Sequence, residues 1–409
     1  MQKWLSRSLL IILLFIAIII VISFAGCSKD NADTIKITDM SGTVVEIPRS
    51  PKKIAAVSPS TGDLMIAFGL GELLDGTYFS TLDNPWATEI YPEAKDFYGY
   101  DYDNSVETFI MRGVDLIFIP EPATAQMLRE HGLNALCIRQ FAEDGYDDYV
   151  FYFSEMIKQI WGGDKAVSEK IDMWQSDFTT ALNTVKQTLD AHPEIQTQKL
   201  YYINGEKDRG LGYTDLGKSL LETVYKALKI DFICNRFESN RPSVEAVLEI
   251  NPDIISIGGI YQKKRLNELY STEPWNQIKA VRENKVYNIP VGFVGFEQTC
   301  SASALFIYSQ ANQIYPDLFD FDLVTLTQEC LKKYFDYTLT DDAAQNLLDG
   351  YFKDGSLMIE YESRTGCRRP ACKPSHRKYH CSWMHCIGRK RPKGSGPDPP
   401  PGTCRRGRW

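Results

Sequence analysis

The sequence predicts an α/β protein built from two similar, Rossmann-like lobes that a long helical segment connects. A phrase that combines a short helix with a buried strand occurs twice, and the segment between the two copies has helical spacing. The length of 409 residues also favours more than one structural unit. A composition with 44% hydrophobic residues is ordinary for a globular protein, and the net charge of −8 argues against a general nucleic-acid binder.

The first residues have the pattern of a secretory signal. Lys3 and Arg7 precede an unbroken apolar run from Leu9 to Ile22, and Cys27 follows directly after Ala-Gly. A transmembrane anchor is the alternative, but the run is short for crossing a bilayer. The position of the cysteine resembles the bacterial lipobox, in which that cysteine is lipidated.

We therefore expect residues 1–26 to be a lipoprotein signal peptide and Cys27 to carry the lipid. Residues 27–34 are polar and read as a flexible tether. Together these features predict an extracytoplasmic protein that is anchored by lipid to the bacterial cell membrane.

Residues 35–147 form the predicted N-terminal lobe. Ile35–Ile47 alternates apolar and polar residues around Ser-Gly, which is typical of a β-hairpin. Lys53–Val57 is a short apolar strand, and Leu64–Phe68 is a helix that ends at a glycine. The order of strand, loop and helix is typical of an α/β lobe.

The repeated phrase links the two lobes. Ser105-Val106-Glu107 opens a helix that leads through a glycine into the apolar run 114–119, and Ser243-Val244-Glu245 opens another that leads through Asn-Pro-Asp into 254–257. The offset between the copies stays constant along the phrase. Apolar runs of this length fit the buried strands of parallel sheets.

Residues 148–195 are predicted to be the connecting helix. Apolar residues recur at spacings of three to five, Gly162-Gly163 interrupts them, and Pro193 ends the run. Such a segment between two lobes would act as a stiff connector. Residues 196–355 then form the predicted C-terminal lobe, whose elements are expected at Lys199–Ile203, Val286–Ile289, Ser301–Ile314 and Leu323–Phe335.

The tail, residues 356–409, differs sharply from the rest of the chain. From Met358 onward the sequence has thirteen Lys and Arg but only three Asp and Glu, and it contains five of the ten cysteines. A small zinc site is one interpretation, because Cys372, His376 and His380 lie close together. The spacing matches no zinc finger, and the favoured interpretation is a disordered or spurious extension.

Several phrases in order resemble the periplasmic binding proteins of class III, which bind ferric siderophores, cobalamin or haem for ABC importers. Asp39–Pro48 resembles the opening hairpin of that family, Pro51–Ser60 its first strand and loop, Ile160–Gly163 its glycine break, and Ser243–Ile255 its second-lobe phrase. The resemblance covers roughly Ile35 to Phe352. It implies two lobes, one rigid connecting helix and a ligand between the lobes.

The resemblance implies a lipid-anchored solute-binding protein that delivers an iron(III)-siderophore-like chelate to the permease dimer of an ABC importer. It further implies that Glu107 and Glu245, at equivalent positions of the two lobes, dock onto permease arginines, which grip carboxylates with paired hydrogen bonds. The local alternative is helix capping, since serine caps helices and glutamate suits the first turn. The two interpretations are compatible.

The ligand is expected where loops at strand ends converge between the lobes. These loops are rich in aromatic residues, which suit a flat or aryl ligand, and in arginines, which suit carboxylates, catecholates or phosphates. The candidate ligand-binding residues are Ser60, Tyr98, Tyr100, Tyr102, Arg209, Tyr213, Arg236, Arg241, Tyr261, Phe293 and Phe296.

Other ligands and functions stay open. A corrinoid such as cobalamin is the second candidate ligand, and haem is a third. The body holds only His131 and His192, both at expected helix ends, which disfavours a zinc binder of the His-cluster kind and predicts no metal site.

No Gly-x-Ser-x-Gly elbow or phosphate loop occurs in the sequence, so no catalytic residue, no cofactor and no enzyme activity are expected. A metal-cluster or chelatase-type enzyme and a sensor without a transport role are the alternatives from other classes. The body is predicted to be a monomer with limited closure, because a continuous helix resists a large hinge.

Overall fold

Two parallel sheets, one in each lobe, form the frame of the protein. The computed structural model describes residues 33–139, 147–216 and 219–359. The N-terminal sheet has the strand order β5-β4-β3-β6-β7, and all neighbouring strands are parallel. Its strands are β3 (Ile54–Ala56), β4 (Leu74–Tyr78), β5 (Tyr98–Tyr100), β6 (Leu116–Ile119) and β7 (Ala135–Cys137).

Helices follow the strands of this first sheet, as the alternation in the sequence predicts. They are α2 (Pro59–Ala67), α3 (Phe79–Leu82), α4 (Pro85–Ile90), α5 (Val106–Arg112) and α6 (Pro122–Glu130). The strands are buried throughout β3, β6 and β7, which explains why they read as continuous apolar runs. The expected hairpin is present as the antiparallel pair β1 (Thr34–Thr38) and β2 (Val44–Pro48).

The C-terminal sheet has the strand order β11-β10-β8-β9 and is also parallel. Its strands are β8 (Gln198–Asn204), β9 (Ile230–Phe232), β10 (Ile254–Gly258) and β11 (Val286–Asn288). The helices of this part are α9 (Leu220–Ala227), α10 (Val244–Ile250), α11 (Gln262–Ser271), α12 (Lys279–Arg282), α13 (Ser303–Ile314), α14 (Leu323–Phe335) and α15 (Asp341–Leu348). The expected last strand and closing helices are therefore confirmed.

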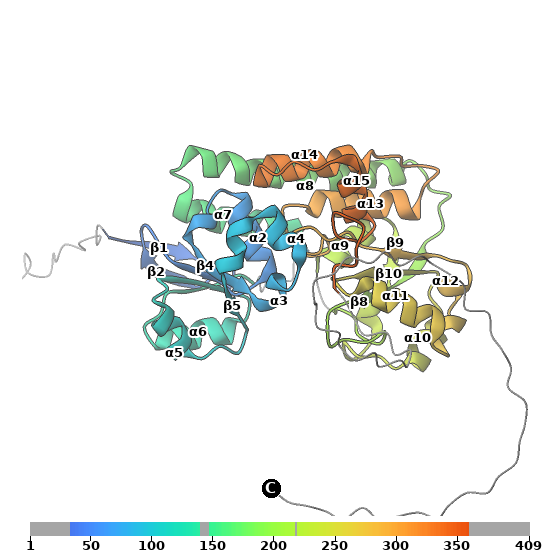
Figure 1. The fold of residues 1–409 in the computed structure, drawn as a ribbon, viewed down its shortest axis with the longest axis horizontal. Helices are drawn as coiled ribbons and strands as arrows, with labels where there is room; N and C mark the ends of the chain where they lie inside the picture. The colour runs from blue at the N-terminus through green and yellow to red at the C-terminus, as the bar shows by residue number, and fades with distance from the viewer. Residues whose placement is uncertain (1–32, 140–146, 217–218, 360–409) are drawn as a thin grey trace, which may run out of the picture. The chain divides into compact units, whose positions relative to one another are not determined.

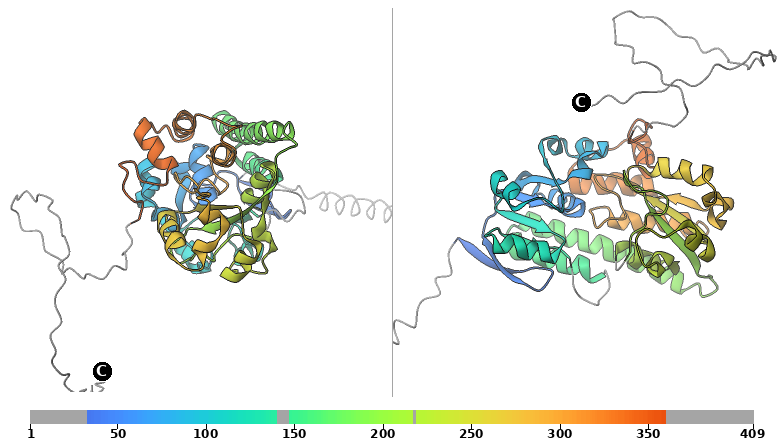
Figure 2. Two further views of the ribbon diagram at one scale, coloured as in Figure 1. Left: turned by 90° about the vertical axis from the view of Figure 1, so that its right-hand side faces the viewer. Right: turned by 90° about the horizontal axis from the view of Figure 1, so that it is seen from below.

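The connector consists of α7 (Asp147–Trp161) and the long α8 (Lys165–Asp190). The predicted break at Gly162-Gly163 separates them, and a Cβ atom on Gly162 would collide with the Lys158 carbonyl. The Asp164 side chain then caps α8 by accepting hydrogen bonds from the Ala166 and Val167 N–H groups. Figures 1 and 2 show α8 running along both lobes, with α14 beside it.

One face of α8 is buried along its whole length, which ties the connector to both lobes. The buried residues are Val167, Ile171, Trp174, Phe178, Ala181, Val185 and Leu189. Helix α13 packs against α8 and α14, and α14 also contacts α2 of the N-terminal lobe. The connector is therefore held on several sides rather than standing free as a hinge.

The repeated phrase forms the same structure in both lobes. The N-cap residues Ser105 and Ser243 have nearly identical backbone angles, with φ of −70° and −69° and ψ of 156° and 154°. Helices α5 and α10 have seven residues each, and each ends at a left-handed residue, Gly113 or Asn251. The next element is β6 in one lobe and β10 in the other, which confirms the internal repeat.

Within the described residues, no helix is both long and apolar enough to cross a membrane. The predicted signal peptide, Cys27 and the tether up to residue 32 lie outside the described residues, and so do residues 360–409 of the tail with their Cys and His cluster.

Candidate functional site

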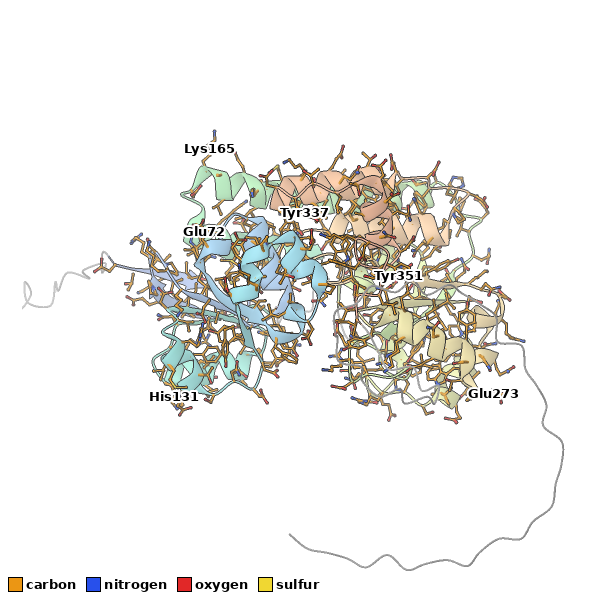
Figure 3. All side chains as sticks on the ribbon, viewed as in Figure 1. Glu72, His131, Lys165, Glu273, Tyr337 and Tyr351 are labelled. Carbon is orange, nitrogen blue, oxygen red and sulfur yellow. The ribbon has the colours of Figure 1, made fainter. Side chains whose placement is uncertain are left out.

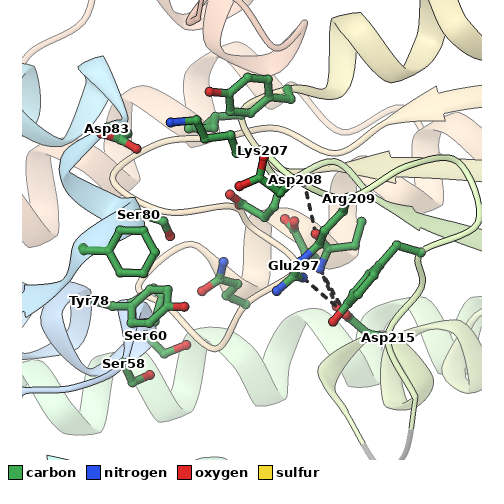
Figure 4. A pocket seen from close by; sticks show the side chains of 18 of the residues that line it. Ser58, Ser60, Tyr78, Ser80, Asp83, Lys207, Asp208, Arg209, Asp215 and Glu297 are labelled. Carbon is green, nitrogen blue, oxygen red and sulfur yellow. Dashed lines mark hydrogen bonds and ion pairs between the residues drawn. The ribbon is translucent and has the colours of Figure 1, made fainter. Parts of the chain in front are cut away.

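A cavity of about 530 Å³ lies between the two lobes. It lies at the carboxyl ends of β3, β4 and β5 on one side and of β8 and β10 on the other. Figure 4 shows Ser58, Ser60, Tyr78 and Asp83 facing a group from the C-terminal lobe across this space. Crevices outside the carboxyl ends of parallel strands are the usual binding sites of open α/β sheets. The size suits a small organic ligand.

The N-terminal wall combines a helix start with an aromatic pair. Ser58 and Ser60 lie at the first turn of α2, directly after β3. The rings of Tyr78, from the end of β4, and Tyr102, just beyond β5, stack with centroids 4.6 Å apart. Burial raises the pKa of both hydroxyl groups, which therefore stay protonated and can donate hydrogen bonds.

The C-terminal wall depends on the loop that follows β8. The buried Arg265 guanidinium donates hydrogen bonds to the Glu206 and Lys207 carbonyls, at 3.1 and 3.0 Å. The Gly205 N–H donates to the Gly258 carbonyl at 3.0 Å, which ties the same loop to the end of β10. These bonds fix the backbone from which Glu206 and Arg209 reach the cavity.

Two guanidinium groups flank one tyrosine ring in the cavity. Arg209 lies 4.3 Å and Arg241 4.8 Å from the centroid of the Tyr213 ring. Arg209 also lies 4.0 Å from Asp215, whereas no described carboxylate lies within ion-pair distance of Arg241. Cation–π contacts orient such groups without neutralising them. The pair can therefore receive an anionic or oxygen-rich part of a ligand.

Carboxyl groups gather on the same wall. Glu297 is only 8% exposed, and its Oε1 accepts hydrogen bonds from the Tyr202 hydroxyl at 3.2 Å and the Gly259 N–H at 3.1 Å. Its Oε2 has no hydrogen-bond partner among the described residues. Burial, followed by repulsion from Glu206 and Asp215, raises the pKa of Glu297 to about 8. Burial also raises the pKa values of Glu206 and Asp215.

Six of the eleven candidate ligand-binding residues line the cavity. They are Ser60, Tyr102, Arg209, Tyr213, Arg241 and Tyr261. They come from the loops after β3, β5, β8, η3 (Ile233–Arg236) and β10, so loops far apart in the sequence converge as expected.

The other five candidates do not line the cavity. Tyr100 is fully buried, stacks on Phe109 at 5.3 Å and donates to Asp75 at 2.6 Å. Tyr98 packs under the Arg112 guanidinium, 4.7 Å from its ring centroid. Both belong to β5 and, because they are two residues apart, they point to the same face of the sheet, where their rings contact each other with centroids 4.8 Å apart.

The remaining three candidates are occupied elsewhere. Arg236 forms an ion pair with Asp231. Phe293 is buried and stacks on Phe335 of α14 at 6.1 Å, and Phe296 is buried as well. The loop that holds both residues belongs to the hydrophobic core between the lobes. The next residues, Glu297 and Gln298, are the ones that line the cavity.

The prediction missed the acidic residues and part of the aromatic lining. The missed cavity residues include Tyr78, Phe79, Asp83, Tyr202, Glu206, Asp215 and Glu297. Tyr78 is the last residue of β4 and Phe79 follows it, so a systematic reading of strand ends would have found both residues. Glu297 gave no such signal, because its place depends on Gly258 and Gly295, where a Cβ atom would collide with its carboxylate.

Glu107 and Glu245 lie on the outside of the two lobes, away from the cavity lining. Both side chains are exposed in the first turns of α5 and α10. Figure 1 shows these helices on the same side of the molecule, opposite the layer of α8 and α14. Hydrogen bonds from its own N–H and from Ser105 lower the pKa of Glu107, which keeps this carboxylate ionised.

His131 and His192, the two histidines in the described part of the chain, do not line the cavity. His131 ends α6 at the periphery of the N-terminal lobe (Figure 3), where Nδ1 lies 2.8 Å from the Met127 carbonyl. His192 pairs with Glu194 just beyond α8. In the parts of the chain that the structure describes, no group of three His, Cys, Asp or Glu side chains is arranged to hold a metal ion.

Comparisons with known proteins agree with this geometry. No family model matches the chain. A Bacillus subtilis protein described as an uncharacterized ABC transporter substrate-binding lipoprotein, YvrC, is 24% identical over 303 residues, which are 71% of this chain and 88% of that protein.

Solved structures share the fold. A periplasmic solute binding protein from Veillonella parvula has a TM-score of 0.62 at 19% identity, over 77% of this chain and 96% of its own. The molybdate-binding protein MolA of Haemophilus influenzae, with molybdate bound, has a TM-score of 0.63 at 16% identity. The match covers 75% of this chain and 99% of MolA.

Two parallel sheets, a long connecting helix and a cavity between the lobes define a class III periplasmic-binding-protein fold. The chain resembles the substrate-binding lipoproteins of ABC transporters, a class that binds and delivers a solute and does not catalyse a reaction.

Proposed function

We propose that this protein captures a ferric chelate of the siderophore kind in the interlobe cavity and delivers it to the permease of an ABC importer. The observation that carries the proposal is the Arg209–Tyr213–Arg241 arrangement, which aims two guanidiniums at one cavity. The oxygen-rich, partly anionic surface of such a chelate suits these donors.

The aromatic wall supports the same ligand class. Tyr78, Tyr102 and Tyr261 present rings to the cavity from both lobes. Aromatic faces pack well against the flat groups that surround a chelated metal, and their hydroxyl groups supply hydrogen bonds. The MolA structure contains a much smaller oxoanion, so ligand identity within this fold depends on the cavity residues rather than on the topology.

The proposal extends to the membrane and the permease. Cys27 is the residue that would carry a lipid anchor. The similar protein YvrC is likewise described as a lipoprotein. Glu107 and Glu245 would each meet an arginine of one permease subunit, because two equivalent exposed carboxylates lie on one side of the molecule.

The test is native mass spectrometry with absorbance of the chain from Ser28 onward, mixed with ferric siderophores, cobalamin and haem. A stoichiometric ferric siderophore complex that weakens in Arg241→Ala is the expected result. Stoichiometric binding of cobalamin or haem alone would replace the proposed ligand by that compound. A folded protein that binds no member of the panel would contradict the proposed ligand class.

A further inference from the structure

The acidic side of the cavity has no role in binding an anionic chelate. Five carboxylate side chains line the cavity against three cationic ones, so the formal charge is negative. The acidic members are Asp83, Glu206, Asp208, Asp215 and Glu297, and the basic members are Lys207, Arg209 and Arg241. A purely anionic ligand would meet repulsion here.

Glu206, Asp215 and Glu297, here called the carboxylate cluster, are close enough to affect one another. Repulsion from Glu206 and Asp215 contributes to the raised pKa of Glu297, and repulsion from Asp215 contributes to that of Glu206. Burying carboxyl groups together is costly unless a partner neutralises them.

The cluster is only partly satisfied by the protein. Asp215 accepts hydrogen bonds from the Asn204 amide at 3.0 and 3.2 Å and lies 4.0 Å from Arg209. Neither Glu206 nor Glu297 has a described cation within ion-pair distance, and the buried Oε2 of Glu297 has no partner there either. Buried polar atoms without a partner are rare in protein structures, and a cation that binds at the site is one explanation for such an atom.

The surroundings suit a cation. Tyr202 and Tyr261 bring aromatic rings to the same wall, and ring faces attract ammonium groups. Both arginines contact Tyr213, and Arg209 also lies 4.0 Å from Asp215, so the basic groups adjoin the cluster at its Asp215 end. Figure 4 shows Glu297 and Asp215 on the C-terminal wall, with Arg209 joined to Asp215.

We infer that the ligand carries a protonated amine, which the carboxylate cluster binds while Arg209 and Arg241 hold its oxygen-rich part. This deepens the proposed function and rests on it for the chelate, but not for the amine. An ammonium group donates hydrogen bonds to several carboxylate oxygens at once, and such charge-assisted bonds are the strong ones. The ligand class is therefore an amine-bearing, partly anionic or oxygen-rich chelate.

The test compares two probes that differ only in this group: the ferric complex of desferrioxamine B, which has a free amine, and that of its N-acetyl derivative. The wild-type protein is expected to bind the amine form at least about tenfold more tightly. Both Glu297→Gln and Glu206→Gln should abolish this preference, measured as the ratio of the affinities for the two probes. Glu273→Gln, at an exposed position far from the cavity (Figure 3), is the matched control.

A diamine, cadaverine, serves as a second probe that needs no chelate. It should raise the melting temperature of the wild-type protein and of Glu273→Gln, but not of Glu297→Gln. Equal affinity for the two ferric probes would overturn the amine inference and leave the proposed function standing. Cadaverine stabilisation without binding of any ferric probe would overturn the chelate and keep the amine. Failure of both probes on folded protein would overturn both.

Measuring the affinity at a series of pH values distinguishes binding of the amine by Glu297 from a purely structural role of this residue. Binding an ammonium group to Glu297 requires the carboxylate form, whose pKa in the free protein is about 8. Affinity for the amine form should therefore rise between pH 6 and pH 9, and affinity for the acetylated form should not. The other charged groups that face the cluster are present in the complexes with both probes, so their effect on the affinity cancels when the two probes are compared. They are Asp83, Lys207, Asp208, Arg209 and Arg241.

Discussion

The Asp63 carboxylate in α2 accepts a hydrogen bond of 2.6 Å from the Ser301 N–H, 238 residues further along the chain. The Ser301 hydroxyl donates to the other carboxylate oxygen at 3.2 Å. This contact joins the N-terminal lobe to the segment that leads into α13. Asp63 is 1% exposed, and burial raises its pKa from 3.8 to about 7 despite both hydrogen bonds.

This raised pKa predicts that the protein loses stability as the pH rises. The folded state binds the Asp63 proton more tightly than the unfolded chain, so the stabilisation is complete below the unfolded value of 3.8 and is lost as the pH passes through about 7. The contribution of Asp63 to the free energy of unfolding should fall by on the order of 4 kcal/mol between pH 4 and pH 8. Urea titrations at a series of pH values measure it.

Asp63→Asn is the matched variant, because the amide keeps an acceptor for the Ser301 N–H without charge. It should remove the part of this pH dependence that Asp63 contributes and equal or exceed the wild-type stability at pH 8. Glu297, whose pKa is raised from 4.5 to about 8, should leave a slope of the same sign and similar size. An unchanged slope in Asp63→Asn would show that this carboxyl group is ionised throughout.

The lobes are predicted to move little when a ligand binds. The Asn84 amide donates to the Gly292 and Phe293 carbonyls at 2.8 and 3.1 Å, and the Trp86 indole donates to the Tyr351 carbonyl at 2.9 Å. Figure 3 labels Tyr351 where the two lobes meet. Such contacts resist a hinge in addition to the stiffness of α8.

Small-angle scattering should therefore give superimposable profiles for the free and ligand-bound protein. Asn84→Ala removes three buried hydrogen bonds, the two donated to these carbonyls and the one that its Oδ1 accepts from the Trp86 N–H. It should cost about 1–3 kcal/mol of stability and should allow a measurable change on ligand binding. A decrease in the radius of gyration of the wild-type protein on ligand binding would contradict limited closure.

The fold could be predicted from the sequence because its signals are local and repeated. Asp115 and Asp253 occupy equivalent positions in the two copies of the phrase. Each backbone N–H donates at 2.9 Å to a lysine carbonyl, of Lys53 or of Lys199. Those lysines stand immediately before β3 and within β8, so the repeat also fixes how each phrase meets the first strand of its lobe. Caps, glycines and apolar runs express such local geometry directly.

The cavity was only partly predictable because its lining depends on strand register and on contacts across the lobes. Tyr100 and Tyr102 are two residues apart and look equivalent in the sequence, yet one is core and the other lines the cavity. Glu297 looks like a surface residue, and only the pairing of its loop with the end of β10 buries it. Neither fact is visible in composition or periodicity.

Tyr213 is predicted to position both cavity arginines. Tyr213→Leu removes the ring between Arg209 and Arg241, which lie 4.3 and 4.8 Å from its centroid, and should weaken ligand binding roughly tenfold. Tyr213→Phe keeps the ring and loses only the hydroxyl that accepts a hydrogen bond from Asn240 at 2.9 Å, so it should bind nearly as well as wild type. Isothermal titration of both variants decides this. Equal affinity in Tyr213→Leu would mean that the ring does not orient the guanidiniums.

Glu107 and Glu245 are predicted to act in delivery and not in ligand binding. Each is exposed at the start of a helix whose N-cap serine has nearly the same backbone angles in both lobes, so the two carboxylates leave the backbone at equivalent positions. Only the Ser243 side chain also caps its helix. Alanine at either position should lower uptake by whole cells, and the double variant should lower it at least about tenfold, because charge-paired contacts dominate the off-rate of such complexes.

Ligand affinity of the purified double variant should stay at the wild-type level, since neither side chain lines the cavity. Glu72→Ala is the control, because Glu72 is also exposed but lies away from α5 and α10 (Figure 3). If uptake is unchanged while ligand still binds, the carboxylates serve only their own helices, and a sensor that works without the permease becomes the better account. Uptake that is lost in Glu107→Arg with Glu245→Arg and restored when the permease arginines are changed to glutamate would establish the docking contact directly.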